Sequence, residues 1–251
     1  MNGPMIVIAG AGSGKTKVLT YKIAYLMTQG VDPFNILALT FTNKAAREMK
    51  ERIANIVGDE AKNLWMGTFH SVFARILRIE AHKIGYTSNF TIYDSDDSQK
   101  LVARIIKELN LDKEKYKYKI IFSRISSMKN NFISADQYIN DEEMLLSDKI
   151  SNRPKFHQIY KQYVDRCFKA GAMDFDDLLL KTNELLNSYP DTLSKYQNIF
   201  RYILVDEYQD TNHSQYLIIR SLSDKFQNIC CLLYTSPSPR DLSTSRMPSS
   251  A

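Results

Sequence analysis

Short apolar runs alternate with longer amphipathic stretches towards both ends of the chain. Continuous apolar runs ended by glycine, threonine or acidic residues are typical of buried strands in a parallel sheet. Such runs predict strands at residues 5–9, 36–41, 65–68, 202–205 and 228–232. Apolar positions spaced every three or four residues predict helices at 16–29, from about residue 43, and from the third strand through residue 79. Strands that alternate with helices indicate an α/β protein with a parallel sheet.

The pattern changes between about residues 94 and 186. Long charged amphipathic segments, such as residues 98–109, replace the short apolar runs there. We therefore expect a mostly helical insertion between the third and fourth strands. Residues 232–251 differ again, because they contain three of the chain's seven prolines and six serines. That composition neither extends a sheet nor forms a helix, so we expect a disordered or foreign tail.

Composition excludes several classes of protein. The 251 residues are 44% hydrophobic, which is enough for a sizeable core. The apolar start at residues 5–9 is too short for a signal peptide, and no stretch approaches the roughly 18 apolar residues of a membrane span. The three cysteines form no C-x-x-C pair, which favours a reducing cytoplasm and gives no zinc site. The net charge of +5 allows a polyanionic partner without indicating one.

A phosphate-binding loop is predicted between the first strand and the first helix. The segment matches G-x-x-x-x-G-K-[ST] except for alanine in place of the first glycine, and it comprises Ala9, Gly10, Ala11, Gly12, Ser13, Gly14, Lys15 and Thr16. Small residues at a helix N-terminus let backbone N–H groups surround phosphate oxygens. We expect Lys15 to reach the β- and γ-phosphates of ATP and Thr16 to bind Mg²⁺. A glycine turn without nucleotide is the simpler alternative, but the flanking strand and helix favour the phosphate loop.

Two adjacent carboxylates follow the fourth predicted strand. Asp206 and Glu207 come directly after the apolar run 202–205, at the edge where open parallel sheets bind ligands. We expect Asp206 to bind Mg²⁺ directly or through water and Glu207 to act as general base towards the attacking water. An acidic strand end alone is usually a solvated turn. Together with the phosphate loop, it indicates a nucleotide hydrolase.

Five segments in order along the chain carry a more specific signal. They are the phosphate loop at 9–16, Leu39-Thr40-Phe41-Thr42-Asn43-Lys44-Ala45-Ala46, Gly67-Thr68-Phe69-His70-Ser71, Met173-Asp174-Phe175-Asp176-Asp177-Leu178 and Asp206-Glu207-Tyr208-Gln209-Asp210-Thr211. These segments resemble the motifs of the UvrD/PcrA/Rep helicases of superfamily 1, and the resemblance extends to about Cys231. It implies an enzyme that uses ATP to move three-prime to five-prime on single-stranded DNA and to unwind single/double-strand junctions.

The resemblance also implies a domain arrangement. We expect a RecA-like P-loop NTPase domain at residues 1–88 and 173–231, an inserted and mainly helical subdomain at 89–172, and a non-native or disordered tail at 232–251. We expect the second RecA-like domain to be missing, together with the glutamine-containing adenine-recognition segment that the family has upstream of the phosphate loop, because only nine residues precede Gly10. Because that second domain supplies arginines to the transferring phosphate, we expect the chain to bind ATP weakly, to hydrolyse it poorly and not to unwind duplex DNA.

Individual residues acquire roles from the same resemblance. DNA contacts are expected at Phe41, Thr42, Asn43, Thr68, Phe69 and His70. Phe41 would stack on a base, although without the resemblance we would interpret its ring as closing the core at a strand end. Gln209 would sense the γ-phosphate and complete a catalytic set with Lys15 and Glu207. The acidic cluster at residues 174–177 could mimic a metal site, but the resemblance makes it a helix-capping motif.

Three other interpretations stay open. The helicase subunit of a recombination nuclease has a similar motor. A P-loop module that uses ATP as a switch would share the loop and the carboxylates but would not bind single-stranded DNA. The chain could also be a product without function, which would not accumulate as a folded protein in cells.

Overall fold

The computed structural model describes residues 3–9 and 15–234, which form two compact units. The first, called the sheet unit, comprises the described parts of Met1–Val72, Leu193–Thr211 and Ile219–Ala251. The second, called the helical unit, comprises Phe73–Thr192 and Asn212–Ile218. These units divide the chain at other residues than the expected domains do, and the domain assignment stays a prediction.

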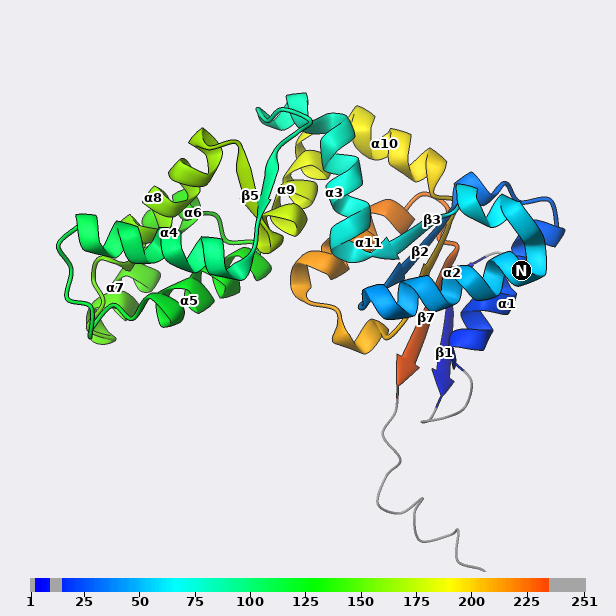
Figure 1. Ribbon diagram of the computed structural model, residues 1–251, viewed down its shortest axis with the longest axis horizontal. Helices are drawn as coiled ribbons and strands as arrows, with labels where there is room; N and C mark the ends of the chain where they lie inside the picture. Colours follow the sequence, from blue (N-terminus) through cyan, green and yellow to red (C-terminus); the bar gives the residue numbers. More distant parts are fainter. Residues whose placement is uncertain (1–2, 10–14, 235–251) are drawn as a thin grey trace, which may run out of the picture. The chain divides into compact units, whose positions relative to one another are not determined.

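A five-stranded parallel sheet forms the centre of the sheet unit (Figure 1). Its strand order is β1-β7-β6-β2-β3, and all neighbouring strands are parallel. The strands are β1 (Met5–Ala9), β2 (Ile36–Thr40), β3 (Trp65–Thr68), β6 (Tyr202–Val205) and β7 (Ile229–Tyr234). The five strands predicted from the apolar runs and the α/β class are thus confirmed.

Helices cover the middle of the sheet on one face. The helices and turns that lie wholly in this unit are α1 (Lys15–Thr28), η1 (Pro33–Asn35), α2 (Asn43–Val57), η2 (Gly58–Asn63) and η4 (Tyr208–Asp210). Leu19 and Ile23 of α1 pack with Met49 of α2 against Ala38 and Leu204 of the sheet. The alternate residues of β2 and β6 are buried as well, so both faces of these two strands are covered. This is why the two strands appear in the sequence as unbroken apolar runs.

The predicted burial of β1 is wrong. β1 occupies one end of the strand order, and Ile6 and Ile8 are 64% and 65% exposed while Met5 and Val7 pack partly against the core. An apolar run predicts a strand but does not reveal whether the strand lies in the middle of its sheet or at an edge. β1 is therefore an edge strand with one solvent-exposed face.

The first three residues of the expected tail extend the sheet, contrary to the prediction from composition. Leu232, Leu233 and Tyr234 extend β7 and pair with Val7, Ile8 and Ala9 of β1. The prolines on which the prediction was based begin only at Pro237. Leucine and tyrosine, the residue types at 232–234, are compatible with a β-strand. Residues 235–251 lie outside the described part of the chain.

The helical unit confirms the predicted change of character after the third strand. Its helices are η3 (Ala81–Ile84), α4 (Ser95–Glu108), α5 (Tyr118–Asn130), α6 (Ala135–Ile139), α7 (Glu142–Ile150), α8 (Phe156–Lys169) and α9 (Phe175–Ser188). Three helices contribute residues to both units: α3 (Phe69–Glu80), α10 (Pro190–Ile199) and α11 (His213–Ser223). A short parallel pair, β4 (Thr91–Tyr93) with β5 (Ala172–Asp174), was not predicted. Three-residue strands are too short to give a periodic signal.

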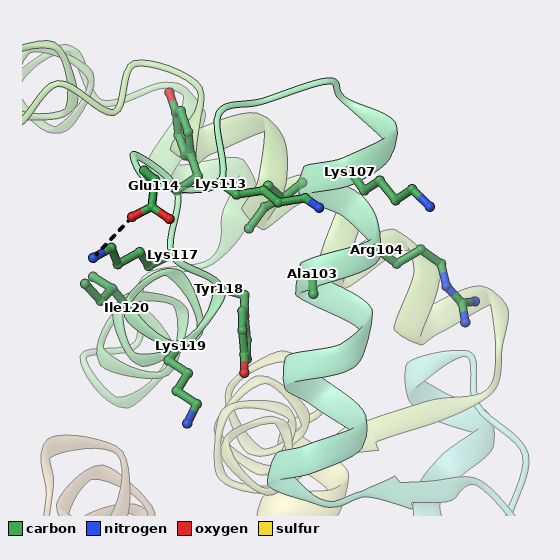
Figure 2. A pocket seen from close by; sticks show the side chains of 11 residues that line it. Ala103, Arg104, Lys107, Lys113, Glu114, Lys117, Tyr118, Lys119 and Ile120 are labelled. Carbon is green, nitrogen blue, oxygen red and sulfur yellow. Dashed lines mark ion pairs between the residues drawn. The ribbon is translucent and has the colours of Figure 1, made fainter.

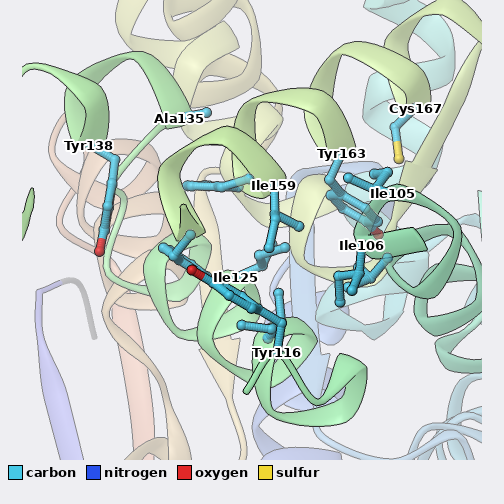
Figure 3. Close-up of a cluster of buried hydrophobic side chains, with 13 residues drawn as sticks. Ile105, Ile106, Tyr116, Ile125, Ala135, Tyr138, Ile159, Tyr163 and Cys167 are labelled. Atoms are coloured by element: carbon cyan, nitrogen blue, oxygen red, sulfur yellow. The ribbon is translucent and has the colours of Figure 1, made fainter. Parts of the chain in front are cut away.

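The helical unit has its own aromatic core (Figure 3). Tyr138, Phe156, Tyr160 and Tyr163 are each at most 1% exposed and surround aliphatic side chains such as Ile125. Tyr138 and Phe156 meet edge to face, with their centroids 5.2 Å apart. Burial of this size is sufficient for a separate core, which explains why the insertion forms a compact unit.

Candidate nucleotide and DNA site

The phosphate-loop segment connects β1 to α1. β1 ends at Ala9 and α1 begins at Lys15, so the strand before and the helix after the motif are both present. Gly10, Ala11, Gly12, Ser13 and Gly14 lie outside the described residues, as do the side chains of Ala9, Lys15 and Thr16. The roles of these residues stay predictions.

Residues 206–211, called the acidic segment, follow β6. Asp206 is only 8% exposed, and its backbone N–H donates to the carbonyl oxygen of Leu39 on β2 at 3.0 Å. Its Oδ1 accepts the N–H of Glu207 at 3.0 Å. These bonds orient the Asp206 carboxylate where β6 ends. The acidic segment therefore starts from a fixed position on the sheet.

Glu207 has an unusual backbone. Its φ of 49° and ψ of 47° lie in the left-handed region, which residues with a Cβ rarely adopt. The side chain is exposed, and the residue leads into η4, where Gln209 is also exposed. The turn thus separates the buried Asp206 carboxylate from an accessible Glu207 carboxylate and an accessible Gln209 amide.

The strand register brings the two halves of the expected site to one edge of the sheet. β7 lies between β1 and β6, and Cys231 pairs with Ile6 on one side and Val205 on the other. The next residue after Val205 is Asp206, while β1 continues in the same direction to Ala9. Neighbouring strands are roughly 4.8 Å apart, so about 10 Å separates β1 from β6. The starting points of both motifs therefore share the carboxyl edge, where such sheets bind ligands.

Two aromatic residues meet at the same edge. Phe41 and Phe69 follow the paired residues Thr40 and Thr68, and their ring centroids are 5.3 Å apart at 52°. Phe69 is 1% exposed, whereas Phe41 is only half-buried. Of the two rings, only that of Phe41 offers surface on which a base could stack.

The other residues expected to contact DNA differ in exposure. Thr42 is the N-cap of α2 and accepts the N–H of Ala45 at 3.1 Å, while Asn43 is exposed. Thr68 is 9% exposed, and its Oγ1 accepts the N–H of Ser71 at 3.3 Å. His70, in the first turn of α3, is half-buried. Local helix capping thus accounts for both threonine hydroxyls.

Gly67 and Ser71 are constrained in a way that the sequence analysis missed. The Oγ of Ser71 donates to the carbonyl oxygen of Thr68 at 2.9 Å, and a Cβ added to Gly67 would lie 2.4 Å from that Oγ. Any side chain at residue 67 would therefore displace Ser71. The available signal was a glycine within a predicted strand, which often marks such a close approach.

The acidic cluster at residues 174–177 caps a helix, as predicted. Asp174 is the N-cap of α9 and forms a capping box with Asp177. Lys129 of α5 is fully buried, and its Nζ lies 2.7 Å from Asp174 and 2.8 Å from Asp177. Over residues 3–9 and 15–234, histidine, cysteine, aspartate and glutamate side chains form no group that could hold a metal ion.

Burial and charge act against each other in this cluster. Burial alone would lower the pKa of Lys129, but Asp174 and Asp177 outweigh it and hold that pKa above its ordinary value. Burial and the neighbouring Asp174 raise the pKa of Asp177 to about 6 against the opposing effect of Lys129. Lys129 is thus the charge that allows two buried carboxyls to coexist.

Comparison with known proteins identifies the class of this fold and site. The family of the UvrD/REP helicase N-terminal domain matches residues 1–232. The ATP-dependent DNA helicase PcrA of Staphylococcus epidermidis is 44% identical over 229 residues, which cover 91% of this chain and 31% of that relative. PcrA of Staphylococcus aureus is 44% identical over the same share of this chain and 30% of its own length.

The chain belongs to the UvrD/REP helicase family. The predicted resemblance is confirmed, and these relatives are named as ATP-dependent helicases that act on DNA. The chain spans about a third of their length. None of the described helices is long and apolar enough to cross a membrane.

Proposed function

We propose that the chain is the ATP-binding part of a helicase that moves three-prime to five-prime on single-stranded DNA and unwinds single/double-strand junctions. The observation that carries the proposal is the register of β7, which joins the strand before the phosphate loop to the strand before the acidic segment. The RecA-like domain at residues 1–88 and 173–231 and the inserted subdomain at 89–172 are part of this proposal.

The residues at the edge suit a magnesium nucleotide. A threonine hydroxyl and an aspartate carboxylate are the hard oxygen donors that Mg²⁺ prefers, and Thr16 and Asp206 would supply them. Asp206 is held by its own backbone bond to Leu39, so its carboxylate is oriented in advance. The bound ion would neutralise charge on the phosphates, while Lys15 and the N–H groups of residues 9–16 would hold the β- and γ-phosphates.

Glu207 and Gln209 would perform the hydrolytic step. Glu207 would accept a proton from the attacking water, since its carboxylate is exposed beside the buried Asp206. Gln209 would contact the γ-phosphate from the following turn.

Binding of single-stranded DNA distinguishes this function from that of an ATP switch. Phe41→Ala should weaken binding of a short single strand by roughly 1–3 kcal/mol, the usual contribution of one stacked base. Titration of a labelled oligonucleotide at several salt concentrations would measure it. Phe34→Ala is the matched control, because Phe34 also packs on a buried ring, that of Trp65, but precedes β2 instead of following it.

Two outcomes would count against the proposal. If the wild-type chain shows no single-strand affinity that falls with salt, the switch module becomes the better interpretation. Equal reductions in affinity for Phe41→Ala and Phe34→Ala would remove Phe41 from the DNA site.

A basic hollow in the helical unit supports the contact with junctions. The hollow has a volume of about 930 Å³ and is lined by eleven residues between Ala103 and Ile120 (Figure 2). Five of the lining side chains are cationic and one is anionic, and they are Arg104, Lys107, Lys113, Lys117, Lys119 and Glu114. Tyr118 and Ile120 are 41% and 43% exposed beside them. Such a combination of concavity and positive charge suits a nucleic-acid backbone.

Reversing this charge should weaken binding of duplex-containing DNA. The triple variant Lys113→Glu, Lys117→Glu and Lys119→Glu should reduce the slope of log affinity against log salt by about 0.9 for each phosphate that is no longer neutralised. A salt titration with a tailed duplex measures the slope. The control reverses three exposed lysines of the same unit outside the hollow, Lys149, Lys155 and Lys169. Equal slopes for the two triple variants would exclude the hollow as the contact surface.

A further inference from the structure

The side chain of Asn130, the last residue of α5, connects three segments of the helical unit. Its Nδ2 donates to Asp176 Oδ1 at 2.8 Å and to the carbonyl oxygen of Ser126 at 2.9 Å. Its Oδ1 accepts the Nδ2 of Asn212 at 2.5 Å. The orientation of the amide is fixed by chemistry, because the carbonyl oxygen of Ser126 can only accept and must face the NH₂ group.

Asn212 in turn holds the start of α11. Its Oδ1 accepts the N–H of Gln215 at 2.9 Å, while Gln215 Oε1 accepts the N–H of Asn212 at 3.0 Å. This reciprocal pair is a capping box. Ser214 adds hydrogen bonds within the same unit, since its carbonyl oxygen accepts the Nδ2 of Asn183 at 2.9 Å. The first turn of α11 is therefore bonded to α5 and to α9.

Asn212 is also the residue that follows the acidic segment. The chain passes from the sheet unit to the helical unit at the bond between Thr211 and Asn212. Within the segment, the N–H of Asp210 bonds to Glu207 O at 2.9 Å and the N–H of Thr211 bonds to Tyr208 O at 3.2 Å. The Oγ1 of Thr211 also donates to Tyr208 O at 2.8 Å. These local bonds close the segment on itself, because they join its residues only to one another. The side chain of Asn212 reaches another helix through its bond to Asn130.

We propose that Asn130 is a positioning residue for the acidic segment. It holds Asn212, and Asn212 fixes the end of the turn that carries Glu207 and Gln209. The bond from the Asp206 N–H to Leu39 fixes the other end. This inference rests on the proposed function, because it assigns Asn130 to the reaction through the residues that would hydrolyse ATP.

The lysine-aspartate cluster explains why Asn130 can serve as an anchor. Lys129, its neighbour on α5, is fully buried between Asp174 and Asp177. The Oγ of Ser214 lies 3.3 Å from the carbonyl oxygens of both Lys129 and Asn130. The end of α5 is thereby attached to the helical core by ionic as well as polar contacts, so Asn130 has little freedom to follow Asn212.

Amide hydrogen exchange in two variants tests the proposal. Asn130→Ala removes the amide, and Asn212→Ser keeps a good helix cap but is too short to reach Asn130. Both should accelerate exchange at the hydrogen-bonded amides of residues 206–212 by roughly tenfold, the effect of removing one hydrogen bond. The control is Asn131→Ala, because Asn131 is exposed and its Nδ2 donates only locally, to Ser127 O at 2.8 Å.

The pattern of effects separates positioning from general stability. Asn130→Ala should leave exchange in α4 and α8 unchanged, and the double variant with Asn212→Ser should exchange no faster than either single variant. Single-turnover hydrolysis with the protein in excess should fall by up to roughly tenfold, while affinity for a magnesium-ATP analogue stays the same. Exchange at 206–212 equal to that of Asn131→Ala, or acceleration spread evenly over the helical unit, would overturn the proposal.

The same preparations test the proposed function separately. Wild-type protein should bind the magnesium-ATP analogue. Absence of that binding would overturn the function and with it the catalytic part of the inference. The exchange data would still decide whether Asn130 holds the acidic segment.

Discussion

Replacing Lys129 with methionine is expected to lower the free energy of unfolding by about 3–5 kcal/mol. The variant leaves Asp174 and Asp177 buried and close together without their shared cation, and breaking a buried ion pair from one side typically has an effect of this size. Methionine fills a similar volume to lysine, so the decrease in the free energy of unfolding reflects the lost charge more than lost packing. Urea unfolding followed by circular dichroism measures it.

The decrease should depend on pH. Without Lys129, the pKa of Asp177 rises further in the folded state, and the pKa of Asp174, which Lys129 helps to hold below its ordinary value, rises as well. At a pH between the pKa of a carboxyl in the unfolded chain and its higher pKa in the folded variant, the folded state binds more protons. The free energy of unfolding therefore falls as pH rises through this range. The difference from wild type should therefore be larger near pH 8 than near pH 5.

Lys119→Met is the matched control for this prediction. Lys119 lies on the same helix, α5, but its side chain is exposed. We expect a change of less than about 0.5 kcal/mol, as for most surface substitutions. Equal effects of the two variants, or a Lys129→Met deficit that does not change with pH, would mean that the ion pairs contribute little.

Replacing Lys15 with alanine is expected to abolish measurable binding of an ATP analogue. In the proposed site, the Lys15 ammonium is the side-chain charge that reaches the β- and γ-phosphates. Charge-assisted hydrogen bonds contribute about 1.5–3 kcal/mol each, and in the proposed site the ammonium would make them to two phosphate groups. Fluorescence titration with a labelled ATP analogue in the presence of Mg²⁺ measures the change.

Lys17→Ala provides the control within the same helix turn. Lys17 is exposed on α1, two residues after the motif lysine, and carries the same charge. Its removal lowers the net charge equally, so a purely electrostatic attraction of nucleotide would be reduced equally by both variants. Unchanged affinity in Lys15→Ala would contradict the assignment of the phosphate loop.

Strand positions could be predicted from the sequence because each buried strand is an uninterrupted apolar run. β3 and β6 match their predicted bounds, and β2 ends one residue earlier than expected. The sequence could not distinguish an edge strand from a central strand, because Ile6 and Ile8 of β1 are as apolar as the buried residues of β2. Strand order depends on pairing between distant segments, and hydropathy contains no information about partners.

The candidate site could be predicted only where chemistry and motif coincide. Asp206 and Glu207 were found because two carboxylates after an apolar run are unusual. Asn130 was missed because a single asparagine at a helix end has no distinctive pattern, and its partners lie 46 and 82 positions away. Lys129 was missed for a related reason, since a lysine is expected on the surface unless its acidic partners are known.

At position 207, the left-handed backbone conformation favours glycine, whereas the proposed reaction requires a carboxylate. A glycine there would relieve backbone strain of roughly 1–2 kcal/mol and would let the turn form more easily. It would also remove the carboxylate to which we assign proton abstraction. Selection for a sturdier fold and selection for turnover would therefore favour different residues at position 207, and a glutamate there marks which of the two prevailed.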